Sequence, residues 1–198
     1  CFSQMEYKRY DIALDKKDRS FSFSEVLLNK GAAAYKQGDY TQAVQLYQEA
    51  AALGNTTAMS NLGYCYYYGM DIPVDKEKAR KYWEAAAVYG DVNAIYKLGD
   101  MHLNGDIARD EEMAWIYYRR AYMLARKHIN PDYYPDICLR MLKYGQNKLS
   151  IRDRVNMGQM AVEAFGKRLA KGDKFSQKLQ KEAQELLKEA MAEYEALR

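Results

Sequence analysis

The residues best suited to chemistry in this chain are its two histidines, and neither has the surroundings of a catalytic or metal site. His102 and His128 do not form a His-x-x-x-His pair. Asp100 and His102 are two residues apart, so on a helix they point in different directions. The sequence also lacks a phosphate-binding loop, a dinucleotide fingerprint and a nucleophile elbow. It therefore predicts no enzyme activity, no cofactor and no metal site, and His102 is interpreted as a core substitute for an aromatic residue.

The three cysteines favour packing over chemistry. An odd number without paired spacing is neither a disulfide framework nor a zinc site. Cys65 and Cys138 lie in apolar stretches, and we expect both to be buried free thiols of a cytoplasmic protein. Cys1 has an alternative interpretation, because a mature bacterial lipoprotein begins with a lipid-bearing cysteine. Under that interpretation the chain is exported.

Tyrosine is the unusual residue of the composition, with 19 among 198 residues. Four of them surround a cysteine in the stretch "NLGYCYYYGM", residues 61–70. An apolar stripe with helical spacing runs through this stretch, formed by Ala58, Leu62, Cys65 and Tyr66. The sequence thus predicts a helix that ends near Gly69 and leaves Tyr64, Tyr67 and Tyr68 outside the stripe, at least partly exposed.

The overall composition is that of a folded chain with no strong charge preference. It is 48% hydrophobic and 29% charged, with a net charge of +3. That charge is too small to indicate nucleic acid, although residues 140–198 are richer in Lys and Arg than in Asp and Glu. No apolar run approaches the roughly 20 residues that span a bilayer. We therefore expect one domain or one short repeat array without a transmembrane segment.

An internal repeat organises the chain. Residues 43–69 shifted by 36 match residues 79–105, with small residues at the same places, and Tyr47 corresponds to Trp83. A period of this length is typical of stacked helical hairpins. Gly63 and Gly99 are predicted to lie at helix crossings, where axes approach closely only if little side chain intervenes.

Turn and capping residues support these hairpins. Gly54 and Gly90 are typical of helix C-terminal positions. Five residues are predicted N-caps of the helices that follow them: Asn55, Asp75, Asp91, Asp110 and Ser150.

The stretches "AVQLYQEAAALGNTTAMSNLGYCYYYGMDIPVD" and "ARKYWEAAAVYGDVNAIYKLGDMHLNGD" resemble the Sel-one-like repeat family, a branch of the tetratricopeptide-like superfamily. The resemblance covers about residues 25–125, and Asp71 departs from it where the family favours glycine. It implies an all-α, right-handed superhelical α/α solenoid. We expect an irregular segment at 1–21, about four hairpins at 22–171 and a capping helix at 172–198. The capping helix is expected to present one apolar face, formed by Phe175, Leu179, Leu186, Leu187, Ala190, Met191, Tyr194 and Leu197.

The resemblance further implies that the first helix of each hairpin lines a concave groove. The positions of this chain that would face the groove and bind a partner are Tyr35, Lys36, Ser60, Tyr64, Tyr67, Tyr68, Asn93, Tyr96, Asp100 and Asn104. Tyrosine is enriched at protein interfaces, so the sequence favours an adaptor or scaffold that binds a protein or peptide, with no small-molecule substrate. One alternative is single-stranded nucleic-acid binding, against which Asp100 argues. Another is an exported factor associated with the cell wall.

Overall fold

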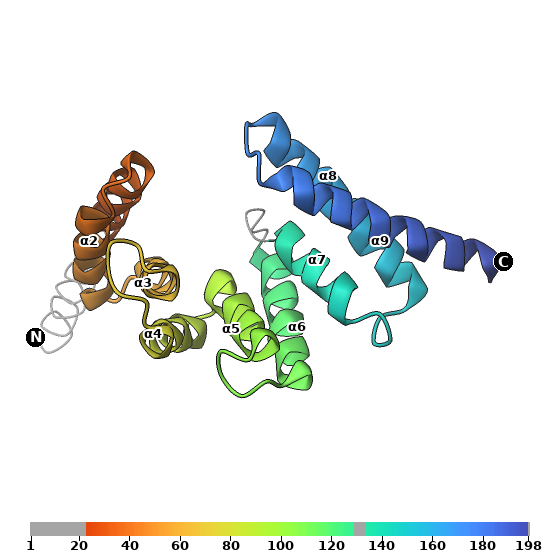
Figure 1. Ribbon diagram of the computed structural model, residues 1–198, viewed down its shortest axis with the longest axis horizontal. Coiled ribbons are helices and arrows are strands. Elements are labelled where there is room, and N and C mark those ends of the chain that lie inside the picture. Colours follow the sequence, from red (N-terminus) through yellow and green to blue (C-terminus); the bar gives the residue numbers. More distant parts are fainter. Residues whose placement is uncertain (1–22, 129–133, 198) are drawn as a thin grey trace, which may run out of the picture. The chain divides into compact units, whose positions relative to one another are not determined.

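The structure is a computed structural model that describes residues 23–128 and 134–197, and every regular element in these ranges is a helix (Figure 1). The all-α prediction is therefore confirmed. The expected irregular segment at 1–21, and with it Cys1, lies outside the described residues. Helix 23–37 is followed by α2 (Tyr40–Ala52), α3 (Thr56–Tyr68), α4 (Lys76–Val88), α5 (Val92–Asn104), α6 (Glu111–His128), α7 (Tyr134–Tyr144), α8 (Ile151–Ala170) and α9 (Ser176–Ala196).

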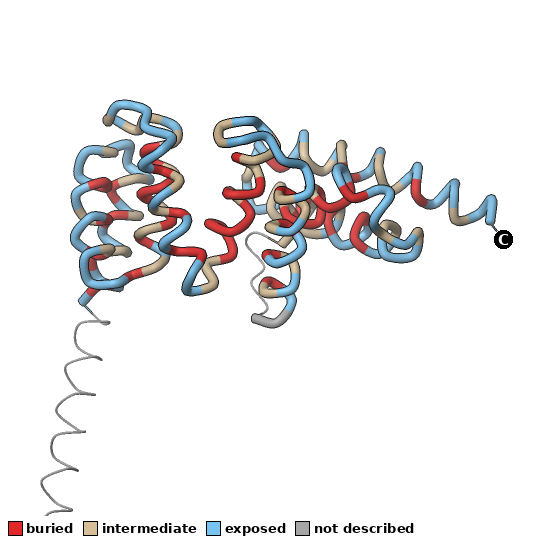
Figure 2. Tube along the Cα trace, turned by 90° about the horizontal axis from the view of Figure 1, so that it is seen from below, coloured by how far each residue is buried: buried red, intermediate tan, exposed pale blue. Residues whose placement is uncertain are grey.

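The chain divides into two compact units, one up to residue 94 and one from residue 95, and each is described by itself. Helix 23–37 and α2 to α4 belong to the first unit. The second contains most of α5 together with α6 to α9. Buried and exposed positions alternate along the turns of the helices in Figure 2, as expected of helices that pack through one face. No helix in the described ranges has the length and apolar character needed to cross a bilayer.

The predicted N-caps are confirmed. Each accepts a hydrogen bond on a side-chain oxygen from the backbone N–H three residues later, which satisfies one of the free donors of a helix N-terminus. The distances are 2.9 Å for Asn55, 2.8 Å for Asp75, 2.8 Å for Asp91, 2.9 Å for Asp110 and 3.1 Å for Ser150.

The helix ends are also placed as predicted. Helix α3 ends at Gly69, whose φ of 72° is in the left-handed region. Two residues later Asp71 also has a positive φ, 53°. Aspartate is one of the few residues with a side chain that tolerates this conformation, which explains how it replaces the glycine of the related repeats.

In the first unit, α3 and α4 meet where Gly63 contacts the Trp83 ring. A β-carbon placed on Gly63 would lie 2.3 Å from Nε1 of Trp83, far inside van der Waals contact. The ring is 1% exposed, and its Nε1 donates a 3.0 Å hydrogen bond to the Ser60 carbonyl. Glycine is therefore required here because the indole lies directly on the α3 backbone, which confirms the predicted crossing.

In the second unit, α5 meets α6 in the same way. A β-carbon on Gly99 would lie 2.8 Å from the ring of Tyr118, which is fully buried. Helices α8 and α9 run antiparallel beside each other (Figure 1). Arg154 pairs with Glu193 near one end of this contact, and Gln180 donates to the Val162 carbonyl near the other.

The apolar face expected on the last helix is only partly buried. Phe175, immediately before α9, is 88% exposed, and Leu197 at its other end is 72% exposed. The fully covered positions of α9 are small: Ser176, Ala183 and Ala190. The residues at the two ends of this face are therefore open to solvent.

We predict that Gly63→Ala lowers the free energy of unfolding by about 1–3 kcal/mol. The added methyl group displaces the buried Trp83 ring, and this outweighs the roughly 1 kcal/mol that alanine gains over glycine in a helix. Chemical denaturation followed by circular dichroism measures the change.

Gly166→Ala is the matched control. Gly166 also lies inside a helix, but a β-carbon there would meet chiefly the flexible end of Gln180. Displacing the Gln180 amide from Val162 should cost about 1 kcal/mol, and the better helix propensity of alanine offsets it by a similar amount, so this variant should change the midpoint little. Equal losses in the two variants would contradict the assignment of Gly63 to a helix crossing.

Candidate functional site

Helix α3 separates its tyrosines between a buried and a half-exposed side. Tyr66 belongs to the buried stripe with Leu62 and Cys65. Its ring stacks on Tyr82 with centroids 5.7 Å apart, and Lys78 Nζ lies 4.2 Å from its centroid. Tyr66 is therefore a packing residue, as the helical stripe predicts.

The other tyrosines of α3 join a continuous set of rings, here called the tyrosine patch: Tyr35, Tyr40, Tyr64, Tyr67 and Tyr68. Tyr35 contacts Tyr40 edge-on at 5.0 Å and Tyr64 at 6.4 Å. Tyr68 lies 4.5 Å from Tyr64 and 4.8 Å from Tyr67. The patch thus spans two consecutive hairpins of the first unit, because Tyr35 and Tyr40 lie on helix 23–37 and α2 while the other three rings lie on α3. Aromatic pairs at these distances stabilise one another.

The patch is anchored on one side and open on the other. The Tyr67 ring packs against the buried Trp83 at 5.4 Å, with Lys76 Nζ 5.4 Å from its centroid. Tyr68 is 47% exposed, and the other four rings are half-buried. Burial, with Tyr64 as a neighbour, raises the pKa of Tyr35 well above its usual value. The Tyr35 hydroxyl therefore stays a neutral donor at physiological pH. Lys36, next to Tyr35, is exposed.

Two predicted site residues of the first unit are not on its surface. Ser60 is 1% exposed and Asn93 is 8% exposed. The amide nitrogen of Asn93 donates a 3.0 Å hydrogen bond to the Ser60 hydroxyl. These side chains join the start of α5 to the middle of α3, in contrast with the expectation that they face an open groove.

The predicted site residues of the second unit also differ in exposure. Asn104, at the end of α5, is exposed, whereas Tyr96 is 7% exposed. The Asp100 carboxylate accepts 2.8 Å hydrogen bonds from the Tyr118 hydroxyl and from Arg140 Nε. Asp100 is therefore part of an internal network and not an open groove residue.

This network holds several charges away from water. Lys97 Nζ lies 3.9 Å from Asp100, and the side chains of both are 14% exposed. Burial lowers the pKa of Lys97, and Asp100 opposes that effect. Burial and Asp100 together raise the pKa of Tyr118 far above its usual value. The arrangement joins α5, α6 and α7 through charge-assisted hydrogen bonds.

His102 does not lie in the buried core. It is partly exposed, and its ring stacks on Tyr117 with centroids 5.6 Å apart. Its Nδ1 lies 3.1 Å from the Ala108 carbonyl oxygen. The ring keeps an aromatic contact but at the surface, so the prediction of a core position is wrong. The His128 side chain lies outside what the structure describes. Among the described residues, no three of His, Cys, Asp and Glu gather where they could hold a metal ion.

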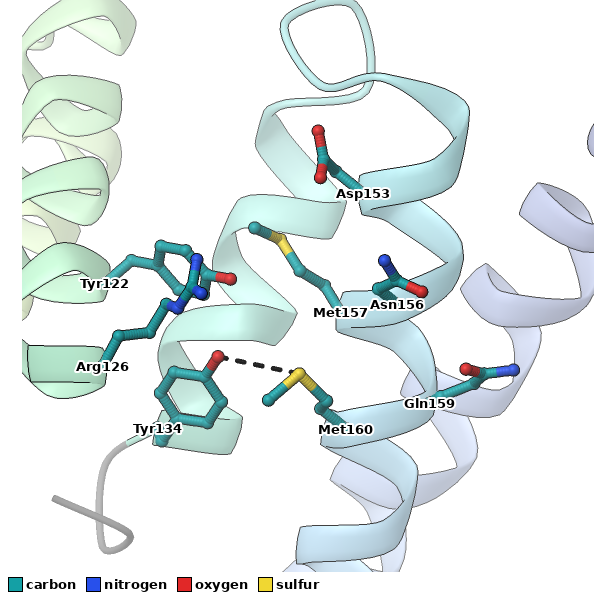
Figure 3. Close-up of a pocket in the computed structure, with 8 residues that line it drawn as sticks. All are labelled: Tyr122, Arg126, Tyr134, Asp153, Asn156, Met157, Gln159 and Met160. Carbon is teal, nitrogen blue, oxygen red and sulfur yellow. Dashed lines mark hydrogen bonds between the residues drawn. The ribbon is translucent and has the colours of Figure 1, made fainter. Parts of the chain in front are cut away.

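A hollow of about 420 Å³ between α6, α7 and α8 was not predicted (Figure 3). The Tyr122 and Tyr134 rings stack 5.6 Å apart, and the Arg126 guanidinium lies 5.7 Å from the Tyr122 centroid. The Tyr134 hydroxyl is 3.7 Å from the sulfur of Met160, as the dashed line shows. The four-residue spacing of Tyr122 and Arg126 is the one feature of the sequence that could have indicated this hollow. Met160 lines it from α8, and no spacing in the sequence relates that residue to Tyr134.

Comparison with known proteins identifies the repeat. The Sel1 repeat model matches three stretches of the chain, residues 26–55, 56–87 and 92–125. The chain is a Sel1 repeat protein. The human protein sel-1 homolog 2 is 33% identical over 81 residues, which are 40% of this chain and 12% of that protein. This chain thus matches only a small part of the length of that curated relative.

Two solved structures are similar. The crystal structure of a Sel1 repeat protein from Oxalobacter formigenes matches with a TM-score of 0.52 at 20% identity, over 85% of this chain and 87% of that one. This match shows the fold. The crystal structure of c5321, a protective antigen of uropathogenic Escherichia coli with the SLR fold, has a TM-score of 0.46 at 17% identity. That match covers 96% of this chain and 48% of that one.

We predict that Cys65 and Cys138 react slowly with a thiol reagent in the folded Sel1 repeat protein. Both are free and almost fully buried, and burial raises their pKa to about 11 and about 12. The reactive thiolate therefore forms only well above the usual thiol pKa of about 8.5. The reaction is followed in a Cys1→Ser variant at neutral pH. Denaturant should accelerate it strongly, and fast labelling without denaturant would contradict the burial.

We also predict that Asp100→Asn destabilises the second unit by about 3 kcal/mol, because it removes the carboxylate that the half-buried Arg140 and Lys97 face. Glu189→Gln, at an exposed position of α9, is the control. Urea denaturation measures both. A loss below about 1 kcal/mol for Asp100→Asn would place the network at the solvated surface instead.

Proposed function

We propose that this Sel1 repeat protein is a non-enzymatic adaptor that binds a partner protein or peptide through the tyrosine patch and Lys36. Sel1 repeats generally mediate protein–protein interactions. The observation that carries the proposal is the contiguity of the patch. Its rings come from two consecutive hairpins and contact one another in series, while Tyr68 remains 47% exposed.

The anchoring of the patch supports binding. Tyr67 rests on the buried Trp83, and Tyr64 lies between Tyr35 and Tyr68. The rings are thus ordered before a partner arrives, so little conformational entropy is lost on association. Tyrosine combines a large apolar face with a hydroxyl that hydrogen-bonds peptide groups. Such pre-ordered aromatic residues are typical of the residues that dominate interface energies.

The remaining predicted positions have different parts in the proposal. Asn104 is exposed on the second unit and stays a candidate contact. Ser60 and Asn93 would not contact the partner. Their hydrogen bond holds α3 in place on its buried side. Tyr96 and Asp100 lie in the interior of the second unit, so they would stabilise its packing without contacting the partner.

We predict that Tyr68→Ala weakens partner binding by roughly 2 kcal/mol, about 30-fold, because an exposed aromatic anchor is lost. The unfolding midpoint should change little, since Tyr68 is the most exposed ring of the patch. Partners are first captured from the source extract and identified by mass spectrometry. Affinity for the purified partner is then measured by calorimetry.

Tyr89→Ala is the matched control, because Tyr89 is 73% exposed at the end of α4 and outside the patch. It should leave both stability and binding unchanged. A Tyr68→Ala variant that folds normally and keeps full affinity would reject the patch as the binding site. Binding of single-stranded oligonucleotides that weakens steeply with salt, together with no protein partner, would favour the nucleic-acid alternative.

A further inference from the structure

The end of α8 and the start of α9 form a groove with a chemistry unlike that of the tyrosine patch. It has a volume of about 570 Å³ and is lined by three lysines, three glutamines and one leucine. The lysines are Lys174, Lys178 and Lys181, and no acidic residue lines the groove. All three are exposed. Lys178 and Lys181 are three residues apart and therefore lie on one face of α9. Lys174 precedes the helix, four residues before Lys178.

The groove lysines lack the acidic partners that several neighbouring cations have. On the adjoining helices Lys143 pairs with Glu182 at 2.5 Å, Lys167 with Glu163 at 2.6 Å and Arg168 with Asp136 at 2.7 Å. Within residues 23–128 and 134–197, no carboxylate forms an ion pair with Lys174, Lys178 or Lys181. Three positive charges therefore share one hollow without local compensation.

Two of the nearby carboxylates are engaged elsewhere. Asp173 accepts hydrogen bonds from the Phe175 backbone N–H at 3.1 Å and from the Ser176 hydroxyl at 2.8 Å. Glu182 is turned toward Lys143 on α7. The positive potential of the groove is thus a fixed property of the α8–α9 hairpin, and it attracts an anionic ligand.

Other features of the groove favour a polypeptide ligand. Gln180 is held by its hydrogen bond to the Val162 carbonyl, whereas Gln177 and Gln184 are exposed and present amides that can pair with a peptide backbone. Phe175, next to Lys174 and immediately before α9, is 88% exposed and offers an apolar contact beside the groove.

We propose that this groove binds an acidic peptide segment of a partner protein. The lining contains no arginine to hold a phosphate in two hydrogen bonds, and Phe175 beside it is a single ring rather than a series on which successive bases could stack. A hollow also fits an extended chain better than it fits the plane of a bilayer. The site belongs to the second unit and is independent of the tyrosine patch.

The test uses a short fluorescent peptide in which aspartate and glutamate alternate with serine, and a counterpart with glutamine in place of every acid. Fluorescence anisotropy with the full chain measures affinity at low and at physiological salt. We expect binding of the acidic peptide only. The triple variant Lys174→Gln, Lys178→Gln, Lys181→Gln should weaken it at least about tenfold.

The control variant Arg152→Gln, Lys167→Gln, Lys188→Gln removes the same charge from exposed positions of the same two helices outside the groove. It should weaken binding no more than about threefold, through the general field alone. Circular dichroism checks that both variants fold. The Tyr68→Ala variant should bind the acidic peptide normally, which separates this proposal from the function proposed above.

Several outcomes would overturn the proposal. Equal losses in the two triple variants, or no binding at low salt, would show a diffuse charge effect or none. Tighter, groove-dependent binding of a single-stranded oligonucleotide or of phosphatidylserine vesicles would assign the groove to those ligands. Self-association that disappears in the groove variant would make a second copy of the chain the occupant.

Discussion

The hairpins of this protein depend on a close contact between a helix backbone and an aromatic ring. In each of the three hairpins that match the Sel1 repeat, a glycine on the first helix lies directly against a buried ring from the second. A β-carbon at any of these glycines would come within 2.8 Å of the ring. The pairs are Gly31 with Tyr47, Gly63 with Trp83 and Gly99 with Tyr118. The large ring fills the space between the two helices, and the glycine allows the axes to approach.

This contact determines which side chains of α3 remain accessible. Because Gly63 and the Ser60 carbonyl lie against Trp83, the rotation of α3 about its own axis is fixed. Tyr67 is then drawn onto the same indole, while Tyr64 and Tyr68 point toward the preceding hairpin and solvent. Packing and the proposed binding surface are therefore two consequences of one constraint, and a change at Gly63 that displaces Trp83 should also disturb the Tyr67 ring that rests on it.

The helices, their caps and their crossings could be predicted because each depends on nearby residues and on the repeat. Asn55 and Asp75 cap helices through contacts three residues away, and Gly63 is one repeat from Gly99. The exposure of groove residues could not be predicted in the same way. Asp100 is covered because Arg140, 40 residues further along the chain, pairs with it. No local pattern announces such a partner.

The charged surfaces show the same limit. The excess of basic residues from position 140 onward is visible in the sequence, but several of them, including Lys143, Arg154 and Arg168, pair with acids on other helices. Only the tertiary contacts show that Lys174, Lys178 and Lys181 remain without carboxylates. Composition thus predicts the sign of the charge, and the packing of α8 on α9 decides where it is available.

The most direct test of the glycine–ring contact is a double-mutant cycle with Gly63→Ala and Trp83→Leu, measured by chemical denaturation. If the ring occupies the space that the methyl group needs, Gly63→Ala should cost at least about 1 kcal/mol less in the Trp83→Leu background than in the wild type. An equal loss of stability from Gly63→Ala in both backgrounds would show that the Trp83 ring does not pack against Gly63, and it would contradict the account.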